Sequence, residues 1–366
     1  MPLKILFIST ARSHVSAEKI RVKYFIKALI RAGYSVLNHE IHYHTIGKYL
    51  NYLFQEPPKD LINYSKNSDL IIATSPPLLN AIYAYMASKH TRKPLIIDVR
   101  DLWEEYAKIK YSRLIYNTIV KRIVKKYYKA LRYATNIIMT TEHMKKHYDN
   151  LLGIGYKTIV IPNGTDPDII KCSNTVKREY DLVYLADFNQ PYHALDILLE
   201  AIRDSTLKLL IIGEGKYLNK IMKKYNNKNT KLNIKLAGKI SYEKLSNYLC
   251  KAKVGVVGRP FINNPEYLYT IPVKTYDYLA AELPILAYGP KNSALEEFIL
   301  QNSIGEYISP YEYNTIYSKL DKLISNLNKY RTKTRSLSML YDRKKISSKL
   351  FKVIEYYSSQ NKYKAT

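Results

Sequence analysis

Short, unbroken runs of apolar residues, many of them β-branched, recur along the chain and are separated by longer segments with helical spacing. A strand that is apolar on both faces must be buried on both faces, as parallel strands are when helices cover the sheet. The runs form two series, which break at IPNGTDPD, residues 161–168. The first series comprises 4–9, 69–75, 94–99, 136–141 and 158–163, and the second comprises 181–186, 209–215, 234–238, 254–258 and 284–289.

The two series predict an α/β protein with two doubly wound, Rossmann-like domains that face a cleft. We place the N-terminal domain at 1–162 and the C-terminal domain at 163–334. The tail, 335–366, is expected to be helical and could cross back to the N-terminal domain. Ligands of such sheets bind beyond the carboxyl ends of the strands, so we expect the chemistry in the loops after Ser9, Val99, Gly213, Gly238 and Gly258.

Composition narrows the class of protein. The 366 residues are 46% hydrophobic, which excludes a disordered chain, and no apolar run is long enough to span a bilayer. We also expect no signal peptide. Cys172 and Cys250 have no CxxC spacing and no histidine cluster beside them. We therefore expect neither a zinc site nor a disulfide framework, and a reducing, cytoplasmic compartment.

The chain is strongly basic, with 58 Lys and Arg against 31 Asp and Glu, a net charge of +27. Such a surface favours anionic partners: nucleic acid, acidic lipid head groups or phosphorylated substrates. The alternative is a drift in composition from an AT-rich genome, because Lys, Tyr, Ile and Asn are all abundant. No nucleic-acid-binding module is recognisable, so we expect no nucleic acid partner.

Five motifs in chain order resemble the nucleotide-sugar-dependent glycosyltransferases of the GT-B fold, most closely glycosyltransferase family 4. They are KPLIIDVRDLWEEY (93–106), TIVIPNGTD (158–166), LLIIGEGKYLNKI (209–221), IKLAGKISYEKLSNYLCKAKVGVVGRP (234–260) and TIPVKTYDYLAAELPILAYG (270–289). The resemblance covers most of the chain.

The resemblance implies transfer of a hexose from a nucleotide diphosphate sugar to a glycan or lipid-linked acceptor, with retention of configuration and without a metal or other cofactor. One alternative is a sugar-nucleotide epimerase of the same fold. Another, from a different class, is a basic nucleic-acid-binding protein. The Asp-Pro-Asp at 166–168 lies in a predicted turn, and we do not interpret it as a metal site.

The segment 270–289 is the predicted donor site. Lys274 and Asp277 are three residues apart, so both project from the same side of a helix that begins near Pro272. A helix start and a lysine suit a diphosphate, and a carboxylate can accept hydrogen bonds from ribose hydroxyls. The resemblance implies that Asp277 contacts the donor ribose. The alternative is an exposed turn on which the two residues pair with each other.

The segment departs from the family pattern in two ways. Tyr269 stands where many members carry a glutamate, and Glu266 is the candidate to replace it. The stretch 185–201 lacks the Arg and Lys that often contact the donor phosphates, and Arg259 is our substitute; the alternative for Arg259 is a surface salt bridge. In the Gly-Glu-Gly turn, the resemblance implies that Gly213 and Glu214 border the nucleotide; the alternative is a plain tight turn.

In the first domain, Arg100 and Asp101 follow a predicted buried strand. Arg100 stays protonated, so it would stabilise the leaving diphosphate, and Asp101 would orient a sugar hydroxyl or the acceptor. The alternative is a structural ion-pair cluster of Asp98, Arg100 and Asp101. His14, in the first loop, either serves the acceptor or is simply solvated.

Residues 111–134 read as one basic helix with seven Lys or Arg and no acid. Ile115, Ile119, Ile123, Tyr127 and Leu131 form an apolar stripe. Basic amphipathic helices lie on anionic membranes, which predicts peripheral attachment to the inner face of the cell membrane. The alternative is a core helix with solvated cations. The predicted membrane-binding residues are Lys121, Arg122, Lys125, Lys126 and Lys129.

Overall fold

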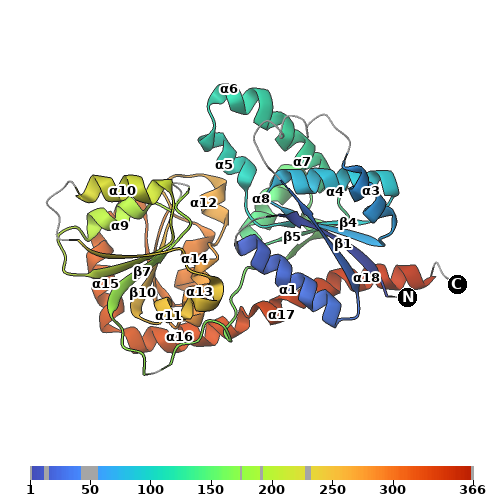
Figure 1. Cartoon of the computed structure of the whole chain (residues 1–366). Coiled ribbons are helices and arrows are strands. Elements are labelled where there is room, and N and C mark those ends of the chain that lie inside the picture. Colours follow the sequence, from blue (N-terminus) through green and yellow to red (C-terminus); the bar gives the residue numbers. More distant parts are fainter. Residues whose placement is uncertain are drawn as a thin grey trace. The chain divides into compact units, whose positions relative to one another are not determined.

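The computed structural model describes residues 2–11, 16–42, 57–173, 175–189, 193–226 and 232–363. The chain divides into two compact units, one comprising Met1–Pro162 with Arg343–Thr366 and the other Asn163–Asp342. Each unit holds a six-stranded, fully parallel sheet with helices on both faces (Figure 1). The predicted α/β class with two doubly wound sheets is confirmed.

The first sheet has the strand order β2-β1-β3-β4-β5-β6. Every residue of β3 and β4 is buried, as their unbroken apolar runs require. In Figure 1, α4 and α7 cover one face of this sheet, and α1 and α18 cover the other. The strands are β1 (Lys4–Thr10), β2 (Ser35–Ile41), β3 (Leu70–Ser75), β4 (Leu95–Val99), β5 (Asn136–Met139) and β6 (Thr158–Val160).

Local sequence signals fix several helix ends of this unit. Ser16 and Thr141 cap α1 and α8 by accepting hydrogen bonds from the backbone N–H three residues on, and Gly153 ends α8 in the left-handed region, with a φ of 66°. The helices are α1 (Ala17–Arg31), α3 (Lys59–Lys66), α4 (Leu78–Thr91), α5 (Trp103–Lys110), α6 (Arg113–Ile115), α7 (Lys121–Tyr133), α8 (Glu142–Leu152), α17 (Arg343–Ser347) and α18 (Lys349–Tyr363).

The second sheet has the order β12-β11-β10-β7-β8-β9. The strands are β7 (Tyr180–Leu185), β8 (Lys208–Ile212), β9 (Asn233–Gly238), β10 (Ala252–Gly258), β11 (Ile285–Tyr288) and β12 (Gly305–Ile308). The helices are α9 (Leu195–Ala201), α10 (Lys216–Asn226), α11 (Ser246–Leu249), α12 (Pro265–Tyr269), α13 (Lys274–Ala280), α14 (Ala294–Gln301), α15 (Ile316–Ser325) and α16 (Leu327–Leu340).

Tyrosines fill much of the core of this second unit. Tyr184, Tyr278 and Tyr288 are fully buried. The hydroxyl of Tyr278 accepts a hydrogen bond from the backbone N–H of Leu185 (2.8 Å), and that of Tyr288 donates to the carbonyl of Ala194 (2.7 Å). Each buried phenol therefore satisfies its polar atom while its ring packs against aliphatic neighbours.

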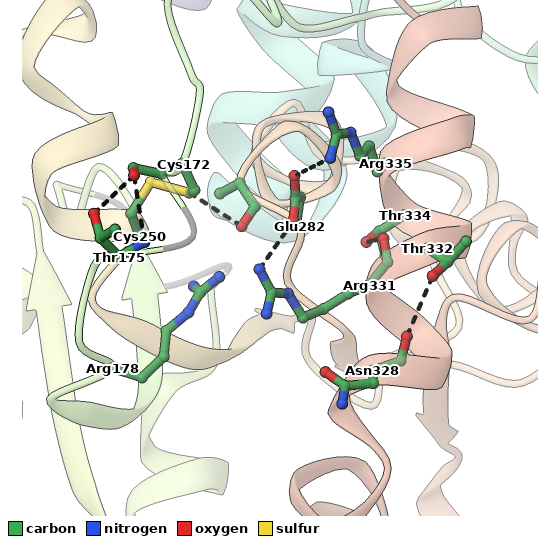
Figure 2. A network of polar contacts seen from close by, with 12 residues as sticks. Cys172, Thr175, Arg178, Cys250, Glu282, Asn328, Arg331, Thr332, Thr334 and Arg335 are labelled. Atoms are coloured by element: carbon green, nitrogen blue, oxygen red, sulfur yellow. Dashed lines mark hydrogen bonds and ion pairs between the residues drawn. A yellow bond between two sulfur atoms is a disulfide. The ribbon is translucent and has the colours of Figure 1, made fainter.

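The two cysteines form a disulfide, so the expectation that they would not pair is wrong. Cys172 and Cys250 are 78 residues apart in sequence, with a Cα–Cα distance of 5.4 Å. In Figure 2 the disulfide shares a polar network with Glu282, which pairs with Arg331 (3.1 Å) and Arg335 (3.6 Å). Sequence spacing does not reveal such a contact, because the fold of the unit creates it. The argument for a reducing compartment from unpaired cysteines therefore no longer holds.

Candidate functional site

Lys274 opens α13 and is buried, with 7% of its surface exposed. Its Nζ has no hydrogen-bond partner among the described residues and lies 4.5 Å from the ring centroid of Tyr184. Burial, together with the charge of Arg259, lowers the pKa of Lys274 well below its usual value. A buried amine without a partner is unfavourable by itself, and a bound anion would relieve it.

Arg259 follows β10 directly and is also buried. Its guanidinium donates to Thr270 Oγ1 (2.9 Å), and its Nη2 lies 3.8 Å from an oxygen of Glu266. Its Nε has no hydrogen-bond partner among the described residues. Arg259 and Lys274 thus bring two cationic side chains together, and Glu266 is the carboxylate that pairs with Arg259.

His193, which the sequence analysis missed, lies beside both cationic side chains. Burial lowers its pKa well below the usual range, and the charges of Lys274 and Arg259 add to this effect. The Tyr184 hydroxyl donates to the His193 carbonyl, which ties the loop after β7 to the same tyrosine that lies under Lys274. The sequence signal that could have identified His193 is its position in the loop after β7, because in the resembled family this loop supplies the Arg and Lys that contact the donor phosphates. We call Lys274, Arg259 and His193 the anion site.

Asp277 has different neighbours from Lys274. Its carboxylate is buried and accepts a hydrogen bond from the hydroxyl of Tyr242 (3.3 Å). The same hydroxyl accepts from the backbone N–H of Asp166 (3.1 Å). Since the Lys274 amine has no hydrogen-bond partner in the described part of the chain, the alternative of a surface Lys274–Asp277 pair does not describe this structure.

The Gly-Glu-Gly turn is shaped by close packing. Gly213 has a φ of +132°, and a Cβ there would lie 1.8 Å from the carbonyl oxygen of Ala186. The carbonyl of Glu214 accepts from the backbone N–H of Phe188 (3.0 Å), and the Glu214 side chain is exposed. Glycine is therefore required at Gly213 whether or not a nucleotide binds nearby.

Arg100 is held rigidly in the first unit. It donates to the carbonyl of Pro76 and lies 3.5 Å from a carboxylate oxygen of Glu18. Asp101 is half-buried, and its carboxylate makes no hydrogen bond or ion pair with any residue that the structure describes. A fixed cation and an accessible carboxylate thus lie next to each other just beyond β4. His14 lies outside the described residues.

Asp98 is part of a separate buried pair. It accepts from Arg21 at 2.8 Å, and Arg21 also donates to the carbonyls of Ile161 and Pro162, each at 2.9 Å. Asp98 and Arg100 therefore have different ionic partners, and the single three-residue cluster considered above does not form. Arg21 anchors the end of the first unit's last strand.

The basic segment is helical without interruption from Arg113 to Tyr133, but its helical repeat is not uniform. A π-helical turn, Tyr116–Val120, separates α6 from α7. Ile123, Tyr127 and Leu131 are buried in the first unit's core, whereas Lys121, Arg122, Lys125, Lys126 and Lys129 are exposed. The helix thus packs its apolar stripe and leaves its cations in solvent.

No cluster of three or more potential metal ligands occurs among the residues that the structure describes. In the Asp-Pro-Asp turn, the Asp166 carboxylate accepts from the backbone N–H of Asp168 (3.0 Å), as a turn residue does. Within the same described ranges, none of the helices combines the length and apolar character needed to cross a bilayer.

Known proteins match both halves of the chain. The family model for Glycosyltransferase Family 4 matches residues 19–169, and that for Glycosyl transferases group 1 matches residues 166–336. An uncharacterized glycosyltransferase of Methanocaldococcus jannaschii is 24% identical over 212 residues, which are 57% of this chain and 56% of that protein. The chain thus spans little more than half the length of this curated relative.

Two solved structures show the same fold. Sucrose-phosphate synthase from Thermosynechococcus elongatus has a TM-score of 0.77 at 14% identity, over 98% of this chain and 100% of that one. Anabaena HepE in complex with UDP-glucose has a TM-score of 0.74 at 14% identity, over 97% and 100%. These similarities show the GT-B fold, and the two family models, which together match residues 19–336, show that the chain belongs to glycosyltransferase family 4, a family of retaining, metal-independent glycosyltransferases.

Proposed function

We propose that this protein transfers a hexose from a nucleotide diphosphate sugar to a glycan or a lipid-linked acceptor, with retention of configuration, in glycan or glycoconjugate biosynthesis. The observation that carries the proposal is the buried Lys274 amine without a hydrogen-bond partner beside the buried Arg259. Two desolvated cationic side chains suit a diphosphate, which carries negative charge on several oxygens. No metal is needed for this role, because the side chains supply the positive charge.

The same cations would assist the reaction. As the sugar–phosphate bond breaks, negative charge grows on the leaving diphosphate, and fixed cations in a water-poor site stabilise that charge best. Glu266 holds Arg259 in place. Asp277, fixed by Tyr242, would accept hydrogen bonds from the donor ribose. The solved complex of Anabaena HepE with UDP-glucose supports a nucleotide sugar as ligand, and Gly213 and Glu214 would border its nucleotide.

On the acceptor side, Asp101 would orient the attacking hydroxyl. Its carboxylate is half-buried and makes no hydrogen bond or ion pair with a described residue, so it is available to a ligand. Arg100, fixed by Glu18 and Pro76, would supply a preorganised positive charge for the leaving group.

Thermal stability with nucleotides tests the donor site. UDP or GDP should raise the melting temperature, since a ligand at about 100 times its Kd stabilises by about 2.7 kcal/mol. Lys274→Met should abolish the shift. Lys251→Met is the matched control, because Lys251 pairs with Glu179 on the surface of the same unit. Stabilisation by generic duplex DNA, with none by any nucleotide, would refute the transferase proposal in favour of nucleic-acid binding.

The product decides between transferase and epimerase. NMR of the anomeric proton should show the donor's configuration in a product joined to the acceptor. An inverted anomer would contradict retention. Conversion of one nucleotide sugar into another without an acceptor would instead identify an epimerase.

We propose in addition that the exposed cations of α7 attach the protein to an anionic membrane surface, on the cytoplasmic face of the cell membrane. Each basic residue near such a surface contributes about 1 kcal/mol. Replacing Lys121, Arg122, Lys125 and Lys126 with Glu should release the protein from anionic vesicles. A wild-type protein that never binds such vesicles would contradict the attachment.

A further inference from the structure

The apolar stripe of α7 is already used inside the first unit, so it is not available to a lipid bilayer. The segment that precedes α7, in contrast, leaves its apolar side chains exposed. Leu114 is 74% exposed, Ile109 46% and Ile115 44%. No residue of α6 is buried, and Figure 1 shows α6 at the end of α5, away from the sheet of its own unit. We call Ile109, Leu114 and Ile115 the apolar tip.

The π-helical turn changes which side chains of this helical segment face the core. A π-turn inserts one residue into the helical repeat, and one residue corresponds to about 100° of rotation. Ile115 belongs to the same sequence stripe as Ile123 and Tyr127, yet those two are buried and Ile115 is not. The extra residue of the turn thus accounts for the exposure of Ile115, whereas Ile109 belongs to the separate helix α5.

The charge around the tip identifies its partner. Residues 106–141 contain no Asp or Glu and nine Lys or Arg. Lys108 is neutralised by Glu105 (2.5 Å), but Arg113, Lys121, Arg122 and Lys125 are exposed and pair with no described acid. An exposed apolar tip next to exposed cations of the same helical segment matches a surface with anionic head groups above hydrocarbon. Nucleic acid offers the anions but no comparable hydrocarbon layer to receive Leu and Ile.

We propose that the apolar tip inserts into the hydrocarbon boundary of an anionic bilayer, while the exposed cations of α6 and α7 contact the head groups. The proposal rests on the membrane attachment proposed above and adds the residues that enter the lipid. Electrostatic attraction is screened by salt, whereas apolar insertion is not. We therefore predict that the part of the membrane binding that comes from the apolar tip persists at high salt.

Vesicle sedimentation separates the two contributions. Wild type should bind phosphatidylglycerol-containing vesicles and retain part of this binding at high salt. Leu114→Ser with Ile115→Ser should lower the high-salt partition coefficient at least about tenfold. Leu340→Ser is the matched control, because Leu340 is 71% exposed in the second unit, and it should bind like wild type. Equal binding of the double variant and wild type at high salt overturns the proposal.

A fluorophore reports insertion directly. The two native cysteines are joined, so Leu114→Cys provides a single free thiol for an environment-sensitive dye. Its emission should shift to the blue on anionic vesicles, and that of a labelled Leu340→Cys should not. Vesicle binding without a shift at position 114 overturns the insertion but keeps the electrostatic attachment. A dimer that Leu114→Ser dissociates, without vesicle binding, would assign the tip to a second copy of this chain instead.

The UDP-induced rise in melting temperature is measured on the same variants. It should be unchanged in all of them, because the tip and the anion site belong to different units. Failure of membrane insertion is thereby distinguished from failure of the proposed transferase function.

Discussion

The Lys274 amine lies 4.5 Å from the ring centroid of Tyr184, without a hydrogen-bond partner among the described residues. An aromatic face attracts a cation, but it replaces only part of the lost hydration. The neighbouring Arg259 opposes the ammonium further. The ligand-free protein thus keeps an unfavourable group in place, as sites that bind charged ligands commonly do.

We therefore predict that Lys274→Met stabilises the ligand-free protein and abolishes nucleotide binding. Methionine fills a similar volume without a polar group, and removing a buried polar group that lacks a hydrogen bond recovers about 1–3 kcal/mol. Calorimetry should show a higher melting temperature for the second unit, with no further rise on adding UDP or GDP. A variant that is less stable than wild type yet still responds to nucleotide would contradict this role.

Nucleotide binding should take up protons. The pKa of Lys274 is lowered in the free protein, and an adjacent diphosphate favours the charged amine, so the pKa rises on binding. Between the free and bound pKa values the complex holds the additional proton, so affinity should fall as pH rises. Titration calorimetry in two buffers of different ionisation enthalpy measures the uptake. Lys274→Arg stays protonated, so it should retain affinity but lose the proton uptake that Lys274 contributes. Any proton uptake that remains in this variant is assigned to His193.

The interior of both sheets was predictable because its strands are apolar on both faces. β3 and β4 are buried at every position, which an unbroken apolar run encodes directly. The edge strands β2 and β12 were missed. In β2, Ser35, Asn38 and Glu40 interrupt the apolar residues, since several positions of this edge strand are not buried. β12 has only four residues. An edge strand needs burial on fewer sides, so its sequence can carry a weaker signal, although the other two edge strands, β6 and β9, were predicted.

In the candidate site, position along the chain identified the charged residues but not their neighbours. Arg259 was found because it ends a strand, and Lys274 because it begins a helix. Tyr242 was missed because its role depends on contacts with Asp277 and Asp166, which are 35 and 76 residues away in sequence. Such roles arise from tertiary packing, as does the pairing of Cys172 with Cys250.

The stability of the first unit should fall as pH rises from about 4.5 to about 7, because of Glu104. Burial raises the pKa of this carboxyl from 4.5 to about 7, although the hydrogen bond from Tyr148 opposes the rise. The folded protein therefore holds a proton that the unfolded chain releases, and stability declines as pH rises from about 4.5 to about 7. The shift corresponds to about 3 kcal/mol.

Glu104→Gln removes this titration and should flatten the melting temperature across that range, with a gain over wild type at pH 8. The matched control is Glu105→Gln. Burial raises the pKa of Glu105, but hydrogen bonds from His147 and Lys108 outweigh burial and lower it. The Glu105→Gln control should therefore show the same fall in melting temperature with rising pH as wild type. Parallel curves for Glu104→Gln and wild type would show that Glu104 does not titrate in this window.

The disulfide should stabilise the second unit. In the chain-entropy description, closing a loop of this length, with a sequence separation of 78 residues, contributes about 4.5 kcal/mol. Cys172→Ser with Cys250→Ser should lower the melting temperature of the second unit, and dithiothreitol should do the same to wild type. The double variant must be insensitive to dithiothreitol. If the reductant changes neither protein, the bond contributes nothing to stability.

Substitutions in the Gly-Glu-Gly turn separate packing from ligand binding. Gly213→Ala places a Cβ 1.8 Å from the carbonyl oxygen of Ala186 at a φ of +132°, so the backbone must shift. We expect a loss of about 3 kcal/mol, seen as a lower melting temperature with or without nucleotide. Glu214→Ala changes an exposed side chain and should leave stability within about 0.5 kcal/mol. If Glu214 borders the nucleotide, this variant should bind UDP or GDP more weakly at unchanged stability; unchanged affinity would limit the turn to a packing role.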